Sequence, residues 1–222
     1  MTAAPASERA LELSTLAEVA EGCTNCRLAD GRLSVVFGSG AADADVMFVG
    51  EGPGQREDEQ GLPFVGPSGD ILERLLGEIG LARKDVYIAN VVKCRPPGNR
   101  DPRPDEIDAC KDYLRAQLRL VDPAVVVTLG NFAAKLLLRT ETGITRLRGT
   151  AYPWWNRYLV PTFHPAAALR GSAQVLEQMR EDFATVSRLV DAPPPAEAAS
   201  DPADAEELSA PQQEPNQLDL FE

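Results

Sequence analysis

The sequence has little of what several protein classes require. No hydrophobic stretch approaches the length of a transmembrane helix, which argues against a membrane protein. The first nine residues lack a basic patch followed by an apolar run, so we expect no signal peptide and a cytoplasmic protein. No Gly-Lys-Ser/Thr sequence follows a glycine-rich segment, which excludes a Walker loop. With one histidine and four cysteines in 222 residues, few side chains are candidates for imidazole or thiolate chemistry.

Basic residues are also absent from the C-terminal stretch. Residues 191–222 carry nine acidic residues, no Lys or Arg, and six of the 18 prolines. This composition is typical of a disordered acidic tail. The remaining 190 residues hold 25 acidic and 22 basic side chains, so their net charge is −3 although that of the whole chain is −12. We therefore expect one domain at 1–190 and a disordered, Pro-rich tail at 191–222, and the overall acidity does not exclude a nucleic-acid partner.

Four short apolar runs rich in β-branched residues predict strands. They lie at 46–49, 86–92, 124–129 and 158–163, and their continuous rather than alternating apolar character is typical of strands covered on both faces. Helical patterns separate them, one of them at 131–138, and further helices are expected at 8–20 and 173–190. This alternation predicts an α/β domain: a three-layer α/β/α arrangement around a central, mostly parallel four-stranded sheet.

In such sheets the chemistry lies beyond the carboxyl ends of the strands. The loop at 50–54 packs three glycines around Glu51, although a tight turn alone would also explain it. The loop after the second strand carries four cations between 93 and 103, which is either a phosphate-binding loop or a solvated basic face. His164 follows the last strand; it is either a structural residue or a neutral imidazole that donates to a developing anion.

The four cysteines indicate a shared role. Cys23 and Cys26 form a C-x-x-C pair, Cys94 follows a predicted strand, and Cys110 falls on the inward face of a helix that begins at Pro104. Two neighbouring ligands plus two distant ones favour a tetrahedral metal or an iron–sulfur centre. Two disulfides are the alternative, but without a secretory segment an oxidising compartment is not expected. Ligand count alone leaves zinc and iron–sulfur both open.

Several ordered motifs resemble those of the type 4 uracil-DNA glycosylases, iron–sulfur members of the uracil-DNA glycosylase superfamily. With the cysteines they span about residues 23 to 170, and they read GEGPG at 50–54, GLPFVG at 61–66, ANVVKCRPP at 89–97 and HP at 164–165. The resemblance implies a monofunctional hydrolase that flips uracil out of DNA, hydrolyses its N-glycosidic bond and so initiates base excision repair. It also implies a [4Fe–4S] cluster held by the four cysteines.

The resemblance assigns roles to individual residues. Phe64 would stack on uracil, Asn90 would read its edge beside Gly52, and His164 would donate to O2 as the bond breaks. Glu51 and Asn99 would position the attacking water, with the choice between them open, and Glu51 could instead bond within its own loop. The predicted DNA contacts are Lys93, Arg95, Arg100, Arg170 and, as a wedge into the duplex, Leu169.

The end of the chain reads QLDLF at 217–221, similar to the pentapeptide by which bacterial repair and replication proteins dock on the sliding clamp. The clamp-binding side chains would be Gln217, Leu218, Leu220 and Phe221, unless the apolar end is incidental. We expect a monomer in the cytoplasm, associated with the nucleoid, whose partner is uracil-containing DNA. The alternatives are a non-catalytic iron–sulfur DNA-binding module of the same fold and, less favoured, a nucleotide-binding α/β enzyme.

Overall fold

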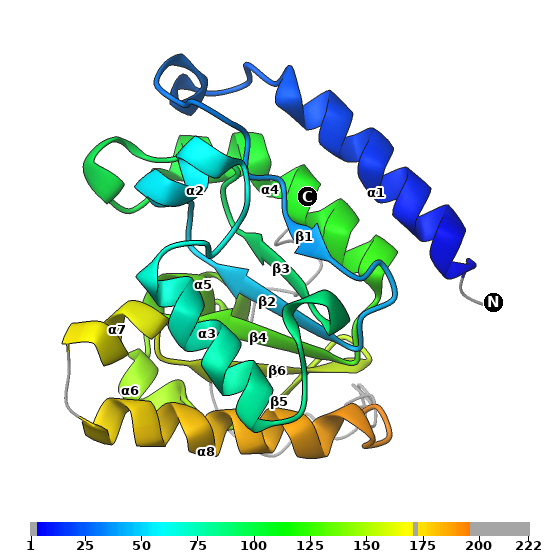
Figure 1. The fold of residues 1–222 in the computed structure, drawn as a ribbon, viewed down its shortest axis with the longest axis vertical. Helices are drawn as coiled ribbons and strands as arrows, with labels where there is room; N and C mark the ends of the chain where they lie inside the picture. The colour runs from blue at the N-terminus through cyan, green and yellow to red at the C-terminus, as the bar shows by residue number, and fades with distance from the viewer. Residues whose placement is uncertain (1–3, 171–172, 196–222) are drawn as a thin grey trace, which may run out of the picture.

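A single sheet lies between two helical layers in the computed structural model, which describes residues 4–170 and 173–195 (Figure 1). Its strand order is β1-β3-β2-β4-β6-β5. The four inner strands are parallel, and both edge strands run antiparallel to their neighbours. The inner strands are β3 (Tyr87–Asn90), β2 (Val46–Gly50), β4 (Val125–Leu129) and β6 (Arg157–Thr162); the edges are β1 (Ser39–Gly40) and β5 (Tyr152–Trp154).

The predicted α/β/α arrangement is confirmed, but the predicted number of strands is wrong. The four apolar runs become the four parallel strands, and the sheet gains two antiparallel edges, so that it has six strands in the described residues. Neither edge strand has more than three residues, and one of the two contains Gly40 and the other Pro153. Such short, irregular edges produce no apolar run from which a strand could be predicted.

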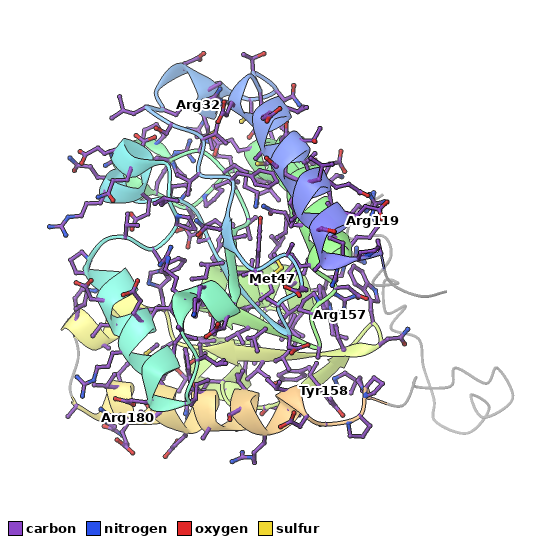
Figure 2. The ribbon with its side chains drawn as sticks, turned by 45° about the vertical axis from the view of Figure 1, so that its right-hand side comes forward. Arg32, Met47, Arg119, Arg157, Tyr158 and Arg180 are labelled. Carbon is purple, nitrogen blue, oxygen red and sulfur yellow. The ribbon has the colours of Figure 1, made fainter. Side chains whose placement is uncertain are left out.

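Alternate residues of each inner strand face opposite helical layers. Met47 and Val126 pack with α1, α4 and α5, whereas Phe48 and Val127 pack with α3 and α8. Met47 is fully buried near the centre of the molecule (Figure 2). The first layer contains α1 (Ala6–Glu21), α4 (Pro104–Val121) and α5 (Asn131–Leu138); the second contains α3 (Pro67–Glu78) and α8 (Ala173–Val190).

Short helices connect the strands and the longer helices. Three of them follow strands at their carboxyl ends: α2 (Gln55–Gln60) after β2, the 3₁₀ turn η3 (Pro97–Asn99) after β3 and α7 (Pro165–Arg170) after β6. The others are α6 (Ile144–Leu147) and the 3₁₀ turns η1 (Arg27–Asp30) and η2 (Arg83–Asp85), the last of which precedes β3 at its amino end. The loop after β3 stays paired with the loop after β2, because Val91 N–H and Val92 N–H donate to the carbonyls of Gly50 and Glu51. Two predicted site-bearing loops are therefore held side by side.

The start of α4 is fixed by one buried carboxylate. Pro104 occupies the first turn, where its missing N–H costs nothing. Glu106 is fully buried and accepts from the backbone N–H of Arg103 at 2.8 Å, closing the first turn. The same carboxylate pairs with Arg100 at 2.6 Å, so the end of the basic loop is tied to the helix that follows it.

In the described part of the chain, no helix combines the length and the apolar character needed to cross a bilayer. Helix α8 ends at Val190, and the domain boundary expected at this residue stays a prediction. The tail from 196 onward, including the predicted clamp-binding residues, lies outside the described residues.

Candidate active site

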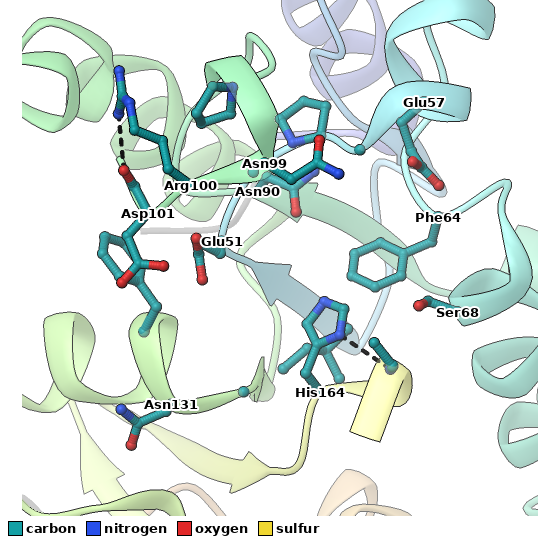
Figure 3. Close-up of a pocket in the computed structure, with 18 of the residues that line it drawn as sticks. Glu51, Glu57, Phe64, Ser68, Asn90, Asn99, Arg100, Asp101, Asn131 and His164 are labelled. Atoms are coloured by element: carbon teal, nitrogen blue, oxygen red, sulfur yellow. Dashed lines mark hydrogen bonds between the residues drawn. The ribbon is translucent and has the colours of Figure 1, made fainter. Parts of the chain in front are cut away.

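A cleft of about 1430 Å³ opens at the carboxyl ends of the parallel strands (Figure 3). It brings together side chains from every loop that the sequence singled out, although the first and the last of these loops are more than 100 residues apart in the chain. The predicted site residues that line it are Glu51, Gly52, Phe64, Asn90, Asn99, Arg100, His164 and Arg170. Eight of the predicted residues thus share one cavity.

The floor of the cleft is formed by an amide and an aromatic ring that converge on a glycine. Asn90 ends β3 and is 1% exposed, and among the described residues its Oδ1 has no hydrogen-bond partner. Gly50 stands opposite it at the end of β2. A Cβ added to Gly50 would lie 2.4 Å from Asn90 Oδ1 and 2.8 Å from Cζ of Phe64. The missing side chain therefore allows the ring and the amide to meet, with an acceptor left unpaired.

Phe64 is held in an unusual backbone conformation. Its φ of 52° lies in the left-handed region, which bulky residues rarely occupy. Glu57 Oε1 accepts from the backbone N–H groups of Val65 at 3.0 Å and Gly66 at 2.9 Å. On the other side Arg83 donates to the Phe64 carbonyl at 2.9 Å. These charge-assisted bonds fix the ring before any ligand arrives.

His164 faces Phe64 across the cleft, with ring centroids 5.7 Å apart and planes inclined by 32°. Its Nδ1 accepts from the backbone N–H of Ala166 at 3.1 Å. Burial, and then the charge of Arg170, lower the pKa of His164 to about 4. The imidazole is therefore neutral at pH 7, and because Nδ1 is an acceptor, the ring proton is on Nε2. Gly130 packs directly against His164. Its backbone has a φ of 97°, and a Cβ added to Gly130 would lie 3.0 Å from the Cβ of the histidine.

Two candidate water-positioning groups, Glu51 and Asn99, also line the cleft (Figure 3). Burial raises the pKa of Glu51 to about 7, and the nearby carboxylate of Asp101 adds to this by its charge and by a side-chain hydrogen bond. Asn99 has a left-handed φ of 54°, and its Oδ1 accepts from Arg95 Nε at 2.8 Å. Glu51 thus titrates near neutrality, whereas the amide oxygen of Asn99 already has a partner.

The predicted role of Lys93 in DNA binding is wrong. Its side chain is 1% exposed, and its ammonium donates to the carbonyl of Asn90 at 2.7 Å and to Gln117 Oε1 at 2.5 Å. The reason is its position: the chain turns inward after β3, so this cation points between the sheet and α4. A buried ammonium cannot reach a phosphate.

The other predicted DNA contacts remain near the surface. Arg95 is half-buried beside Asn99, and Arg100 combines its place in the cleft with its ion pair to Glu106. Leu169 is 49% exposed on α7, next to Arg170 at the mouth of the cleft. Their roles on DNA stay predictions.

A second, smaller cavity is lined by all four cysteines. No disulfide joins any pair of them. Cys94 and Cys110 are buried, and Cys23 and Cys26 are partly exposed. The cavity lies at the end of the molecule where Arg32 is labelled in Figure 2, between the C-terminal end of α1, the loop after β3 and α4. The fold therefore brings the two distant cysteines to the C-x-x-C pair.

Hydrogen-bond donors point at two of these sulfur atoms. The backbone N–H of Lys93 lies 3.3 Å from Cys110 Sγ, and Arg32 lies 3.5 Å from Cys94 Sγ. Burial raises the pKa of the Cys110 thiol to about 11 and raises that of Cys94, while Lys93 and Arg32 oppose these shifts. Geometry alone assigns no single-ion site among the His, Cys, Asp and Glu side chains of residues 4–170 and 173–195. Four thiols with cationic and N–H partners nevertheless fit a thiolate-ligated centre, which needs such compensation.

Sequence reasoning missed several residues of this site. Glu57 lies in a highly charged stretch that reads as a solvated helix, and Asp101 lies among several prolines and charges. Arg83 is 19 residues from Phe64, and no pattern connects the two. Only Gly50 had a signal, since it begins the glycine-rich loop.

The fold and the cleft define a class: an α/β protein whose cleft, at the carboxyl ends of the strands, has the shape and the polar groups that suit a planar, hydrogen-bonding ring. The cleft is lined by an aromatic side chain, an amide and a neutral imidazole. The sequence profile of the uracil DNA glycosylase superfamily matches residues 37–186. A type-4 uracil-DNA glycosylase of Saccharolobus solfataricus is 40% identical over 191 residues, which cover 82% of this chain and 88% of the relative. One of Thermotoga maritima is 43% identical over 169 residues, 75% of this chain and 88% of the relative.

A type-5 uracil-DNA glycosylase of Pyrobaculum aerophilum is more distant, at 35% identity over 115 residues, 45% of this chain and 50% of the relative. The chain belongs to the type-4 uracil-DNA glycosylases of the uracil-DNA glycosylase superfamily. The family expected from the motifs is thereby confirmed.

Proposed function

We propose that this chain excises uracil from DNA as a monofunctional glycosylase, the step that initiates base excision repair. One observation carries the proposal: the buried, unpartnered Oδ1 of Asn90 lies beside the Phe64 ring, in the same cleft as the Nε2–H group of a neutral His164. The similarity to relatives named type-4 uracil-DNA glycosylases over most of their length supports it.

Asn90 would select uracil over cytosine. Its Oδ1 accepts the N3–H of uracil, and its amide N–H group donates to O4. Cytosine presents an unprotonated N3 and an amino group at these places, so both contacts become mismatched. Each buried polar group left unpaired costs about 1–3 kcal/mol. Two such mismatches in a closed pocket give strong discrimination.

His164 would stabilise the leaving group. As the bond between C1′ and N1 breaks, its electron pair goes to the uracil ring and negative charge builds on O2. The Nε2–H of His164 donates to this oxygen without giving up its proton, because an imidazole that remains neutral at pH 7 is a weak acid. Phe64 keeps the ring in the plane in which this contact forms.

Glu51 is a stronger candidate than Asn99 for activating the attacking water. The attacking water adds its oxygen to C1′ and passes a proton to a base, which leaves free uracil and an abasic site. Glu51 lines the cleft, its side chain is hydrogen-bonded to Asp101 in another loop, and its pKa of about 7 suits a base at neutral pH. Asn99 would help to orient the water through its amide N–H, since its oxygen accepts from Arg95.

DNA would lie across the mouth of the cleft. Arg95, Arg100 and Arg170 would contact phosphates, and the exposed Leu169 would fill the space left by the flipped base. Binding then weakens as salt rises, because each neutralised phosphate releases counterions.

We further propose that Cys23, Cys26, Cys94 and Cys110 hold a [4Fe–4S] cluster. Bound there, the cluster supplies a covalent tie between the N-terminal segment, the basic loop and α4. The purified protein should be brown, with broad visible absorption and iron in place of zinc; a colourless, zinc-loaded protein with full activity would reject the cluster. The cluster would take no part in excision, which would be carried out by the residues that line the larger cleft.

The tail proposal concerns residues outside the described part of the chain. Gln217, Leu218, Leu220 and Phe221 would dock in a groove of the bacterial sliding clamp, with 191–216 as an acidic linker. The protein would act as a monomer on the nucleoid in the cytoplasm. Removing residues 217–222 should abolish binding to purified clamp and leave uracil excision intact; unchanged clamp affinity would end this proposal.

The central experiment uses an oligonucleotide with a single uracil, followed by alkaline cleavage at abasic sites. The iron-loaded protein should yield one break, and Asn90→Ala should lose it while binding DNA as before. If the wild-type protein binds DNA but releases no uracil, the non-catalytic module is correct. Borohydride should trap no covalent complex, since Lys93 is buried and Lys135, which lines the cleft, pairs with Glu141 at 3.0 Å.

A further inference from the structure

Lys93 is the most deeply buried cation in the described part of the chain, and the proposed chemistry makes no use of it. Burying a lysine is costly unless its ammonium finds partners. The side chain lies between the two cavities of the molecule: Asn90 belongs to the floor of the cleft, and Cys94 and Cys110 belong to the cysteine cavity. Its contacts reach both.

On the side of the cleft, Lys93 completes the end of β3. The carbonyl of Asn90 accepts from Lys93 Nζ at 2.7 Å. On that side β3 pairs with β1, but the pairing covers only Ile88 and Tyr87. The ammonium therefore takes the place of a strand partner that the two-residue β1 is too short to supply. The carbonyl that accepts from Lys93 thus belongs to Asn90, the residue whose side chain is proposed to read the base.

A second acceptor fixes the ammonium. Gln117 of α4 is fully buried, and its Oε1 lies 2.5 Å from Lys93 Nζ. Its amide nitrogen donates to the carbonyl of Phe37 at 2.8 Å and to Tyr87 Oη at 3.2 Å. Because both donor positions are taken, the amide cannot flip, and its oxygen stays directed at Lys93. The lysine is held between a rigid helix and the end of β3.

On the side of the cysteines, Lys93 acts through its backbone. Its N–H donates to Cys110 Sγ at 3.3 Å, and the next residue is Cys94. Its own carbonyl accepts from Val36 N–H at 2.8 Å. One residue thus bonds to the segment before β1, to α4 and to the main chain of Asn90.

We propose that Lys93 is a positioning residue that holds the main chain of Asn90 in register for reading uracil and links the base pocket mechanically to the cysteine cavity. The proposal rests on the proposed function, because the consequence of the link is uracil recognition. Without the ammonium, the Asn90 carbonyl would be buried and unpaired, and the end of β3 would shift to find another donor. The amide would then meet N3–H and O4 at poor distances.

The test compares Lys93→Met, which keeps the length of the side chain, with Lys84→Met, an exposed lysine on η2, as the matched control. Both full-length proteins are purified with their metal, and rates are expressed per iron-loaded molecule. Inhibition by free uracil reports on the base pocket, whereas KM for DNA reports mainly on phosphate contacts. For Lys93→Met we expect free uracil to inhibit about tenfold more weakly and kcat to fall by a similar factor, with KM changed less than about twofold. Lys84→Met should match the wild type.

A purely structural role would lower the thermal midpoint or the iron content and leave uracil inhibition per loaded molecule unchanged; that result overturns the proposal. If Lys93→Met does not fold, Gln117→Met decides, since it removes one acceptor of the ammonium and should weaken uracil inhibition about threefold. Inhibition equal to that of the wild type would again refute the link. An inactive wild-type protein would instead refute the proposed function.

Discussion

The close approach at Gly50 makes the sharpest prediction about the base pocket. In Gly50→Ala the new methyl group would lie 2.4 Å from Asn90 Oδ1 and 2.8 Å from the Phe64 ring. Ordinary contacts of this kind need about 3.5 Å, so the amide must move by about 1 Å and the ring by a smaller distance. Phe64 is bonded through its backbone on both sides and resists this movement. The Asn90 amide therefore gives way.

Two costs are expected, one to activity and one to stability. A displacement of about 1 Å breaks the hydrogen bond to uracil N3–H, worth roughly 1–3 kcal/mol once a buried group is left unpaired. This loss lowers kcat/KM by a factor of about 5 to 150. Overpacking of the close-packed site separately lowers the free energy of unfolding by about 1–3 kcal/mol.

The assay is release of uracil from a single-uracil oligonucleotide under single-turnover conditions. Gly77→Ala is the matched control: Gly77 lies within α3, where an added Cβ has no neighbour within 4 Å. Helix propensity predicts that this variant is fully active and about 1 kcal/mol more stable. If folded Gly50→Ala kept the wild-type kcat/KM within about twofold, the amide and the ring would not form the base pocket as described.

Three further outcomes follow from the charges and ligands of the fold. Because Glu51 must be ionised to accept a proton, the rate of excision should rise with pH through about 7. Asp101→Asn should move the midpoint of this pH profile to lower pH, because it removes a neighbouring negative charge. An unchanged midpoint would contradict the pairing of Glu51 with Asp101. Arg100 holds the pKa of buried Glu106 at about 2, so this pair stabilises the fold above about pH 4.5 and the gain is lost as pH falls towards 2. In urea titrations Arg100→Met should therefore lower the free energy of unfolding at neutral pH and lower it less near pH 3; an equal loss at both pH values would contradict the pairing. Cys110→Ser should lose visible absorption and melt at a lower temperature, whereas full absorption would remove Cys110 from the ligand set.

Much of this protein could be predicted from local sequence. The four parallel strands follow from continuous apolar runs, and α5 and α8 have the predicted bounds, because such patterns depend on residues close in the chain. The motifs at the strand ends also identified the family, and eight of the predicted site residues share the cleft, since parallel strands bring their carboxyl ends to one edge.

Other features were decided only by tertiary packing. In the sequence, Lys93 is one of four cations in a basic loop, and its burial depends on Gln117 and on a β1 strand that ends too early. Asp101 acquires its role only because the basic loop folds back to Glu51. The backbone around Phe64 is fixed by hydrogen bonds to Glu57 and Arg83, which come from separate helices. The physical reason is the same in each case. Burial and hydrogen bonding depend on distances between segments, and the one-dimensional pattern carries no such distances.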